Sequence, residues 1–89
     1  RARTDTRIPY PREAWSNRWE ATCTALLHVD HRGRVRDVTE LQCSAHGVVF
    51  GRAFRDYVLR WFRFEPARVD GERIASVVRW EHRFTLEDV

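Results

Sequence analysis

Hydrophobic and polar residues alternate one by one from Ala21 to Val29, and this period of two predicts a β-strand. The polar side of the segment also carries Leu26, which makes both sides partly apolar. Strands that are apolar on both sides are typical of the interior of a sheet, where other elements cover them. We therefore expect this segment to be the central strand of its sheet.

The following residues predict a hairpin and a second strand. Asp30 to Gly33 supplies turn chemistry, and Val35 to Gln42 returns as a strand. The apolar positions of this second strand do not alternate cleanly. A β-bulge inserts one extra residue and interrupts alternation in this way, so we expect a bulge near Arg36 and Asp37.

One helix is predicted before this hairpin and another after it. Ile8 to Tyr10 should run extended because residues before a proline avoid the helical region, and Pro11 then opens a short helix that reaches Trp19. A longer helix should end at Phe64-Glu65-Pro66, again because of the proline. Its apolar residues recur three and four positions apart, at Phe50, Ala53, Phe54, Tyr57, Val58 and Trp61.

The end of the chain predicts a long final strand. After a turn at Asp70-Gly71, residues alternate again from Ile74 to Leu86, and one side is charged along its middle. The order helix, strand, strand, helix, strand is typical of an α+β domain. We expect a three-stranded antiparallel sheet in the order 2-1-3, with two helices on one face. The third strand is then an open edge.

Length and composition are those of one small domain. The chain has 89 residues, of which 43% are hydrophobic and 33% charged, a balance typical of folded domains rather than disordered segments. No apolar run approaches the roughly 20 residues of a membrane-spanning helix. Because the sequence begins with Arg1 instead of Met, we expect a piece of a longer protein, with residues 1–7 as a disordered linker remnant and residues 8–89 as the domain.

Positive charge raises a nucleic-acid alternative. The net charge is +3 and all 16 basic residues are Arg, so a small basic RNA-binding domain is one interpretation. The chain lacks the aromatic pattern of an RNA-recognition motif, and its order of elements differs from that of a double-stranded-RNA domain. We expect no nucleic-acid partner.

No residue pattern indicates catalysis. The 4 histidines fit neither an HExxH nor a CxxC-type metal site. Ser44 and Ser76 lack the G-x-S-x-G context of a nucleophile, and there is no Gly-rich phosphate loop. We expect no enzymatic activity, no catalytic residue, no bound metal and no cofactor.

Four motifs occur in the order and at the spacing of one known family. They are Tyr10-Pro11, Val29-Asp30-x-x-Gly33-Arg34-Val35, Arg60-Trp61-Phe62-Arg63-Phe64-x-Pro66-Ala67, and Asp70-Gly71 leading to Phe84-Thr85-Leu86. Together they resemble the TonB C-terminal domain over Tyr10 to Leu86. The motifs also have structural roles, and we expect Tyr10, Trp61 and Phe64 to be chiefly core residues because large aromatic side chains dominate small cores.

The resemblance implies a binding module in the periplasm of a Gram-negative bacterium, anchored in the inner membrane by an N-terminal segment outside this chain. In this family the inner-membrane helix is powered by the proton-motive force through ExbB/ExbD-type proteins. The terminal domain binds the Ton box, a short segment of an outer-membrane TonB-dependent receptor. It then pulls on this segment to open the receptor for import of siderophores or other nutrients.

The resemblance also implies where the partner binds, because the Ton box adds as a strand beside the last strand. The implied site consists of Ser76, Val77, Val78, Arg79, Trp80, Glu81, His82 and Arg83, together with the extended stretch Arg7, Ile8, Pro9 and Tyr10. An edge strand offers unpaired N–H and C=O groups to such a peptide. Arg79 and Arg83 are candidates for attracting acidic peptide residues, or for discouraging aggregation. Family members often have Gln before the Tyr-Pro pair, where this chain has Pro9.

Cys23 and Cys43 are the only cysteines, and we predict a disulfide between them. In the register set by the turn Cys23 faces Leu41, and the expected bulge shifts its partner to Gln42. Cys43 then lies one or two positions away on the adjacent strand, which is close enough if the ladder ends irregularly. Closing a loop of roughly 20 residues would stabilise the fold by roughly 3 kcal/mol.

Two alternatives stay open. A TonB-like domain can also serve as an adaptor in another periplasmic protein, and the sequence upstream of Arg1 separates the two functions. A Pro-rich spacer and one N-terminal apolar helix would favour the transducer. The domain is either a monomer or a strand-exchanged dimer.

Overall fold

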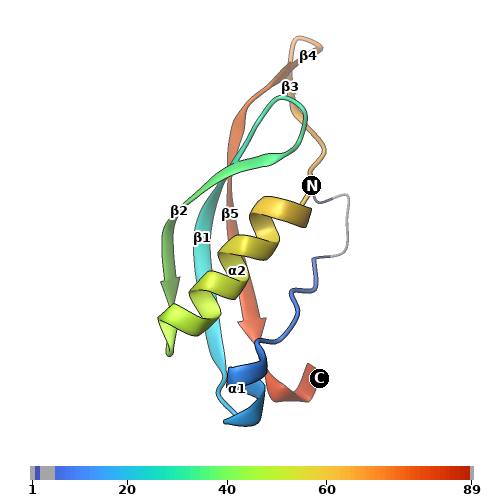
Figure 1. The fold of residues 1–89 in the computed structure, drawn as a ribbon. Helices are drawn as coiled ribbons and strands as arrows, with labels where there is room; N and C mark the ends of the chain where they lie inside the picture. Colours follow the sequence, from blue (N-terminus) through green and yellow to red (C-terminus); the bar gives the residue numbers. More distant parts are fainter. Residues whose placement is uncertain (1, 3–5, 89) are drawn as a thin grey trace.

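Three strands form one antiparallel sheet, and two helices pack on one of its faces (Figure 1). The computed structural model describes residue 2 and residues 6–88. The elements in chain order are α1 (Arg12–Ser16), β1 (Ala21–Val29), β2 (Val35–Cys43), α2 (Gly47–Trp61), β3 (Ala67–Val69), β4 (Glu72–Ile74), β5 (Ser76–Phe84) and the 3-10 turn η1 (Leu86–Asp88). The sheet order β2-β1-β5 confirms the predicted α+β class and the order 2-1-3. Of the predicted disordered tail, residues 1 and 3–5 lie outside the described residues, and the boundary at residue 8 stays a prediction.

The core lies between the sheet and α2. Every second residue of β1 from Ala21 to Val29 is buried, on the side that the alternation predicted. α2 buries Phe50, Phe54 and Val58 completely. Each such side chain stabilises the fold by about 1.5–3 kcal/mol through the hydrophobic effect. These three residues follow the predicted helical spacing, so they lie on one face of α2.

α2 ends at Trp61, before the predicted stop at Phe64-Glu65-Pro66. Phe62 is already extended, with φ −67° and ψ 135°, and both Phe62 and Phe64 are buried in the core. The backbone N–H of Phe64 donates to the carbonyl of Gly33 at 2.8 Å. The predicted helix end was wrong because these contacts with the core and the hairpin loop end the helix before the proline does.

Gly33 makes this contact because it has no side chain. Its φ of +86° is a left-handed value that favours glycine, and a Cβ atom at this position would overlap the carbonyl oxygen of Phe64. Gly33 therefore joins the loop between β1 and β2 to the segment that follows α2. The sequence indicated the turn and not this second contact.

Trp61 is not a core residue, so this prediction was wrong. It is 55% exposed, and the guanidinium of Arg60 lies 5.6 Å from the centre of its ring. The reason is the early end of α2, because the extended backbone after Trp61 directs Phe62 into the core instead of Trp61. The predictions for the other two aromatic residues are confirmed, since Phe64 is buried and Tyr10 is half-buried against the core.

α1 is shorter than the predicted helix, which reached Trp19. Pro11 is extended and caps the helix instead of occupying its first helical position. Arg18 takes a left-handed φ of 57°, which ends the helical path. Trp19 then stacks on the ring of His46, the residue just before α2 in the chain, with ring centroids 3.7 Å apart. A contact between distant parts of the chain therefore replaces the last helical turn.

The predicted final strand over Ile74 to Leu86 is divided. Ile74 belongs to β4, which pairs with β3 around the turn at Asp70 and Gly71, and Ala75 separates β4 from β5. Leu86 lies in η1. Strands of 3 residues, such as β3 and β4, contain too few positions for alternation to be recognised. β5 itself follows the predicted alternation of exposed and half-buried residues.

β2 contains two bulges instead of the single one predicted. The predicted bulge is confirmed at Arg36, which has no partner on β1. The second lies at Glu40 and Leu41, where Glu40 takes a left-handed φ of 51°. Each bulge adds one residue to β2 and shifts its register with β1 by one position.

The second bulge places Cys43 directly opposite Cys23. The predicted offset of one or two positions was therefore wrong, because it allowed for one bulge only. The predicted disulfide is present, with the two Cα atoms 4.0 Å apart. It joins the central strand β1 to the edge strand β2 near the end of their ladder.

Candidate functional site

β5 forms one edge of the sheet and is paired along a single side. Each residue from Ser76 to Phe84 has a partner on β1, without a bulge or a shift of register. Within residues 2 and 6–88 no strand pairs with the other side of β5 (Figure 1). A regular edge of this kind presents unpaired N–H and C=O groups to the solvent.

Hydrogen bonds at the start of β1 show which groups of β5 point outward. The N–H of Ser44 donates to the carbonyl of Thr22 at 2.9 Å, and the N–H of Thr22 donates to Oγ of Ser44 at 3.0 Å. In an antiparallel sheet the N–H and C=O of one residue point to the same side, and this side alternates along the strand. Thr22 therefore points toward β2 and away from its β5 partner Arg83, so Arg83 points away from β1.

By the same alternation, four residues of β5 direct their backbone N–H and C=O groups to the free edge. They are Val77, Arg79, Glu81 and Arg83. The disulfide agrees with this assignment. Cys23 follows Thr22 and points toward β5, so its pair with Cys43 is one without backbone hydrogen bonds, in which Cα atoms lie close together, here at 4.0 Å.

The side chains of β5 alternate between two environments. The four residues with outward backbone groups are exposed on the sheet face that α2 does not cover, and the Glu81 carboxylate lies 3.5 Å from the guanidinium of Arg83. The half-buried residues Val78, Trp80 and His82 lie on the α2 face. Trp80 packs edge-on against Phe62, with ring centroids 5.3 Å apart. The edge is therefore held by the core on one face and open on the other.

The opposite edge of the sheet, β2, is irregular and partly covered. Its two bulges interrupt the ladder. Arg55 of α2 donates to the carbonyl of Val38 at 2.8 Å and lies 3.6 Å from the carboxylate of Asp37. Asp37 in turn accepts the N–H of Val38 at 2.8 Å. These contacts use backbone groups of β2 inside the domain, so β2 offers no continuous row to a partner strand.

A comparison with protein families identifies this architecture. The family model described as the Gram-negative bacterial TonB protein C-terminal domain matches residues 6–86. The chain belongs to the TonB C-terminal domain family. A search of the curated proteins found no match. The family match confirms the predicted resemblance and makes this a periplasmic, transport-associated domain of a family that interacts with outer-membrane receptors.

The N-terminal stretch of this TonB C-terminal domain meets the C-terminal end of β5 through Tyr10. Tyr10 packs edge-on against Phe84 with ring centroids 5.8 Å apart, and its hydroxyl contacts the carbonyl of Trp19 and, at 3.5 Å, that of Phe84. Burial, and to a smaller extent the carboxylate of Glu20, raise the pKa of the Tyr10 hydroxyl, which therefore stays a neutral donor. Tyr10 fastens the chain to the end of the sheet.

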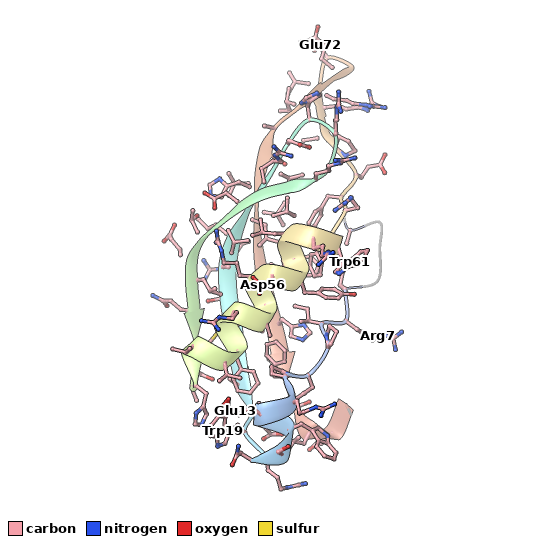
Figure 2. All side chains as sticks on the ribbon, viewed as in Figure 1. Arg7, Glu13, Trp19, Asp56, Trp61 and Glu72 are labelled. Carbon is pink, nitrogen blue, oxygen red and sulfur yellow. A yellow bond between two sulfur atoms is a disulfide. The ribbon has the colours of Figure 1, made fainter. Side chains whose placement is uncertain are left out.

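The other residues of this stretch differ in exposure. Ile8 is buried in the core, whereas Arg7 and Pro9 are exposed. Figure 2 shows the side chain of Arg7 pointing away from the body of the domain. Of the predicted site residues, the structure therefore brings Tyr10 beside the end of β5 near Arg83 and leaves Ser76 at the opposite end of the strand.

Sequence reasoning missed a shallow apolar hollow of about 310 Å³ at the start of β5. Its walls come from all three strands, and the residues are His28, Val29, Asp30, Arg36, Ala75, Ser76 and Val77. The only signal in the sequence is the pair of small residues Ala75 and Ser76 between larger ones. The hollow lies beside the first outward-pointing residue of the free edge, Val77.

Within the described part of the chain, no group of three or more His, Cys, Asp or Glu side chains is placed to hold a metal ion. No helix there has the length and hydropathy needed to cross a membrane, and α2 has 15 residues.

Proposed function

We propose that this TonB C-terminal domain binds the Ton box of outer-membrane TonB-dependent receptors, which adds as a strand along β5. The observation that supports it is the difference between the two sheet edges. β5 is regular and unpaired along its whole outer side within the described residues, whereas β2 is bulged and partly covered. Strand addition needs a continuous row of N–H and C=O groups, and β5 has one.

Main-chain pairing suits a partner that must be held and then released. Four outward-pointing residues from Val77 to Arg83 supply the bonding groups, and each hydrogen bond has a net value of about 1 kcal/mol. A few such bonds give a reversible complex. They also tolerate different receptor sequences, because backbone groups are common to every peptide.

The same geometry supports transmission of a pull. In the proposed cycle ExbB/ExbD-type proteins of the inner membrane use the proton-motive force to move the transducer, and its N-terminal part is anchored in that membrane. The chain reaches the sheet through the stretch from Ile8 to Pro11, and Tyr10 joins this stretch to the C-terminal end of β5. Tension thus arrives beside the strand that holds the receptor segment, and the receptor is opened for nutrient import.

A proline at an outward-pointing position tests this proposal. Glu81→Pro removes an N–H that points to the free edge, and prolines are tolerated at such positions of edge strands. We expect Glu81→Pro to lose binding of synthetic peptides that cover the N-terminal segments of the TonB-dependent receptors of the same bacterium. Glu81→Ala keeps the N–H and should bind within about twofold of the original chain. Heteronuclear NMR titration measures both and maps the shifts to β5.

Two controls keep the result interpretable. His82→Pro removes an N–H that points to β1 and should destabilise the fold by about 3 kcal/mol, unlike Glu81→Pro. N-methylation of the Glu81 amide in a semisynthetic chain removes the same N–H without a proline ring. Equal peptide binding by the original, N-methylated and Glu81→Pro chains, or shifts confined to β2, would show that strand addition to β5 is wrong.

A further inference from the structure

The residues that flank the free edge on the uncovered sheet face form an ordered series. Val77 is the first residue of this series and is 56% exposed. Arg79 follows, and its guanidinium forms no ion pair with any residue of the described part of the chain. Glu81 and Arg83 come last and lie 3.5 Å apart, so their charges offset each other. The series therefore consists of an apolar residue, a cation without an ion pair among the described residues, and an ion pair.

A partner strand on this edge places its own side chains beside this series. Side chains of directly opposite residues lie on the same face, with Cβ atoms about 4.5–5.5 Å apart, and residues two positions apart share a face. The partner residues opposite Val77 and Arg79 are therefore two positions apart and both lie on the uncovered face.

Val77 also lines the apolar hollow, on its side nearest the free edge. Ser76 and Val77 of β5, with Ala75 just before them, line one side of this hollow of about 310 Å³, which continues over β1 to Arg36 of β2. The guanidinium of Arg36 lies 4.0 Å from the carboxylate of Asp30, which leaves little net charge at the rim. An aliphatic side chain opposite Val77 would bury apolar surface of its own and of Val77. Burial of apolar surface is favourable.

We propose that Val77 and Arg79 determine the sequence preference of the bound strand, which carries an aliphatic residue and an acidic residue two positions apart on the uncovered face. This inference rests on the proposed function and specifies the receptor segment that fits. Glu81 and Arg83 select no charge because they are already paired. The order of the two preferred residues reports strand direction: the aliphatic residue precedes the acidic one in a parallel partner and follows it in an antiparallel partner.

A positional scan tests this inference. The probe is the receptor peptide that binds most tightly in the Glu81 experiment, with each position replaced in turn by Asp and by Arg. At one position the original chain should prefer Asp by about fivefold, as attraction and repulsion at an exposed pair allow. Arg79→Glu should reverse the preference at that position, and Arg83→Ala should leave it unchanged.

The second half of the scan compares Leu with Ser two positions away. Leu should bind about fivefold more tightly, and Val77→Ser should remove most of this difference. If Arg79→Glu reverses the preference at no position while Glu81→Pro still abolishes binding, the proposed selectivity is wrong and strand addition stands. If no receptor peptide binds the original chain, both proposals are wrong.

Discussion

The two edge strands of this sheet flank the same central strand but differ in the features that govern strand pairing. β5 is regular and directs the backbone groups of four residues outward. β2 has two bulges, and Arg55 of α2 covers part of it. Bulges and inward contacts are common ways to prevent unwanted pairing at an edge. The domain thus leaves one edge open and blocks the other, which limits association between sheets.

The edges are also attached to the core in different ways. β5 is held to β1 by an unbroken ladder of backbone bonds. β2 is held by an interrupted ladder and by the disulfide between Cys23 and Cys43. The attachment of β2 therefore depends on the disulfide, whereas the attachment of β5 depends on regular backbone pairing.

Removal of the disulfide should have the largest effect on this comparison. The variant Cys23→Ala/Cys43→Ala should lose about 3 kcal/mol of unfolding free energy and roughly 10–20 °C in Tm, because a closed loop is opened. Thermal denaturation followed by circular dichroism measures the change. Reductant should lower the Tm of the original chain and leave the variant unaffected. If both thiols of the original chain react without reduction, the disulfide does not hold β2 to β1.

Relief of the second bulge should have a smaller effect. Glu40 holds a left-handed φ of 51°, which costs a non-glycine residue about 1–2 kcal/mol. Glu40→Gly should therefore stabilise the fold by about 0.5 kcal/mol after the added flexibility of the unfolded chain is subtracted. Arg36→Gly, at the other bulge and without a left-handed φ, should destabilise it by about 0.5–1 kcal/mol. Urea denaturation compares them, and a change of the same sign in both variants would argue against strain at Glu40.

Acid should weaken the hairpin loop that begins β2, with the smallest effect of the three. Hydrogen bonds from the backbone N–H of Arg34 and of Arg32, at 3.0 and 2.9 Å, lower the pKa of the Asp30 carboxyl below its ordinary value of about 4. A carboxyl whose pKa is lower in the folded state stabilises the fold at pH values above the ordinary pKa. This stabilisation is lost as the pH falls through the lower folded value.

The variant Asp30→Asn tests this effect because it cannot titrate. Near pH 7 it should be less stable than the original chain, and the difference should shrink below pH 4. Urea denaturation at both pH values measures it. A difference that stays constant with pH would show that the Asp30 charge has no part in holding the loop.

Predictions from local patterns were correct where one element buries one side. The alternation of β1 and the helical spacing of Phe50, Phe54 and Val58 located the core correctly. These patterns can be recognised in the sequence because a buried face requires apolar residues at a fixed spacing. The helix ends were misplaced, since contacts of Trp19 with His46 and of Phe64 with Gly33 formed instead of the last turns.

The candidate site was only partly accessible to such reasoning. The motifs indicated the family and the alternation indicated a last strand, but the hollow beside Val77 combines residues from three strands. The register of Cys43 depended on a second bulge at Glu40, and the irregular alternation of this strand did not show how many bulges it contains. Errors of this kind add up along a strand because each bulge shifts every later pair by one position.

The order of the elements, the buried faces and the family could all be inferred from residue types and their spacing. Features that depend on register could be found only from the tertiary structure. They are the pairing of Cys43 with Cys23, the blocked edge at β2, and the outward backbone groups of Val77, Arg79, Glu81 and Arg83. The physical reason is that periodicity records which face of an element is buried. Register and edge exposure instead depend on the number and exact position of bulges and on contacts between segments far apart in the chain, which periodicity alone does not fix.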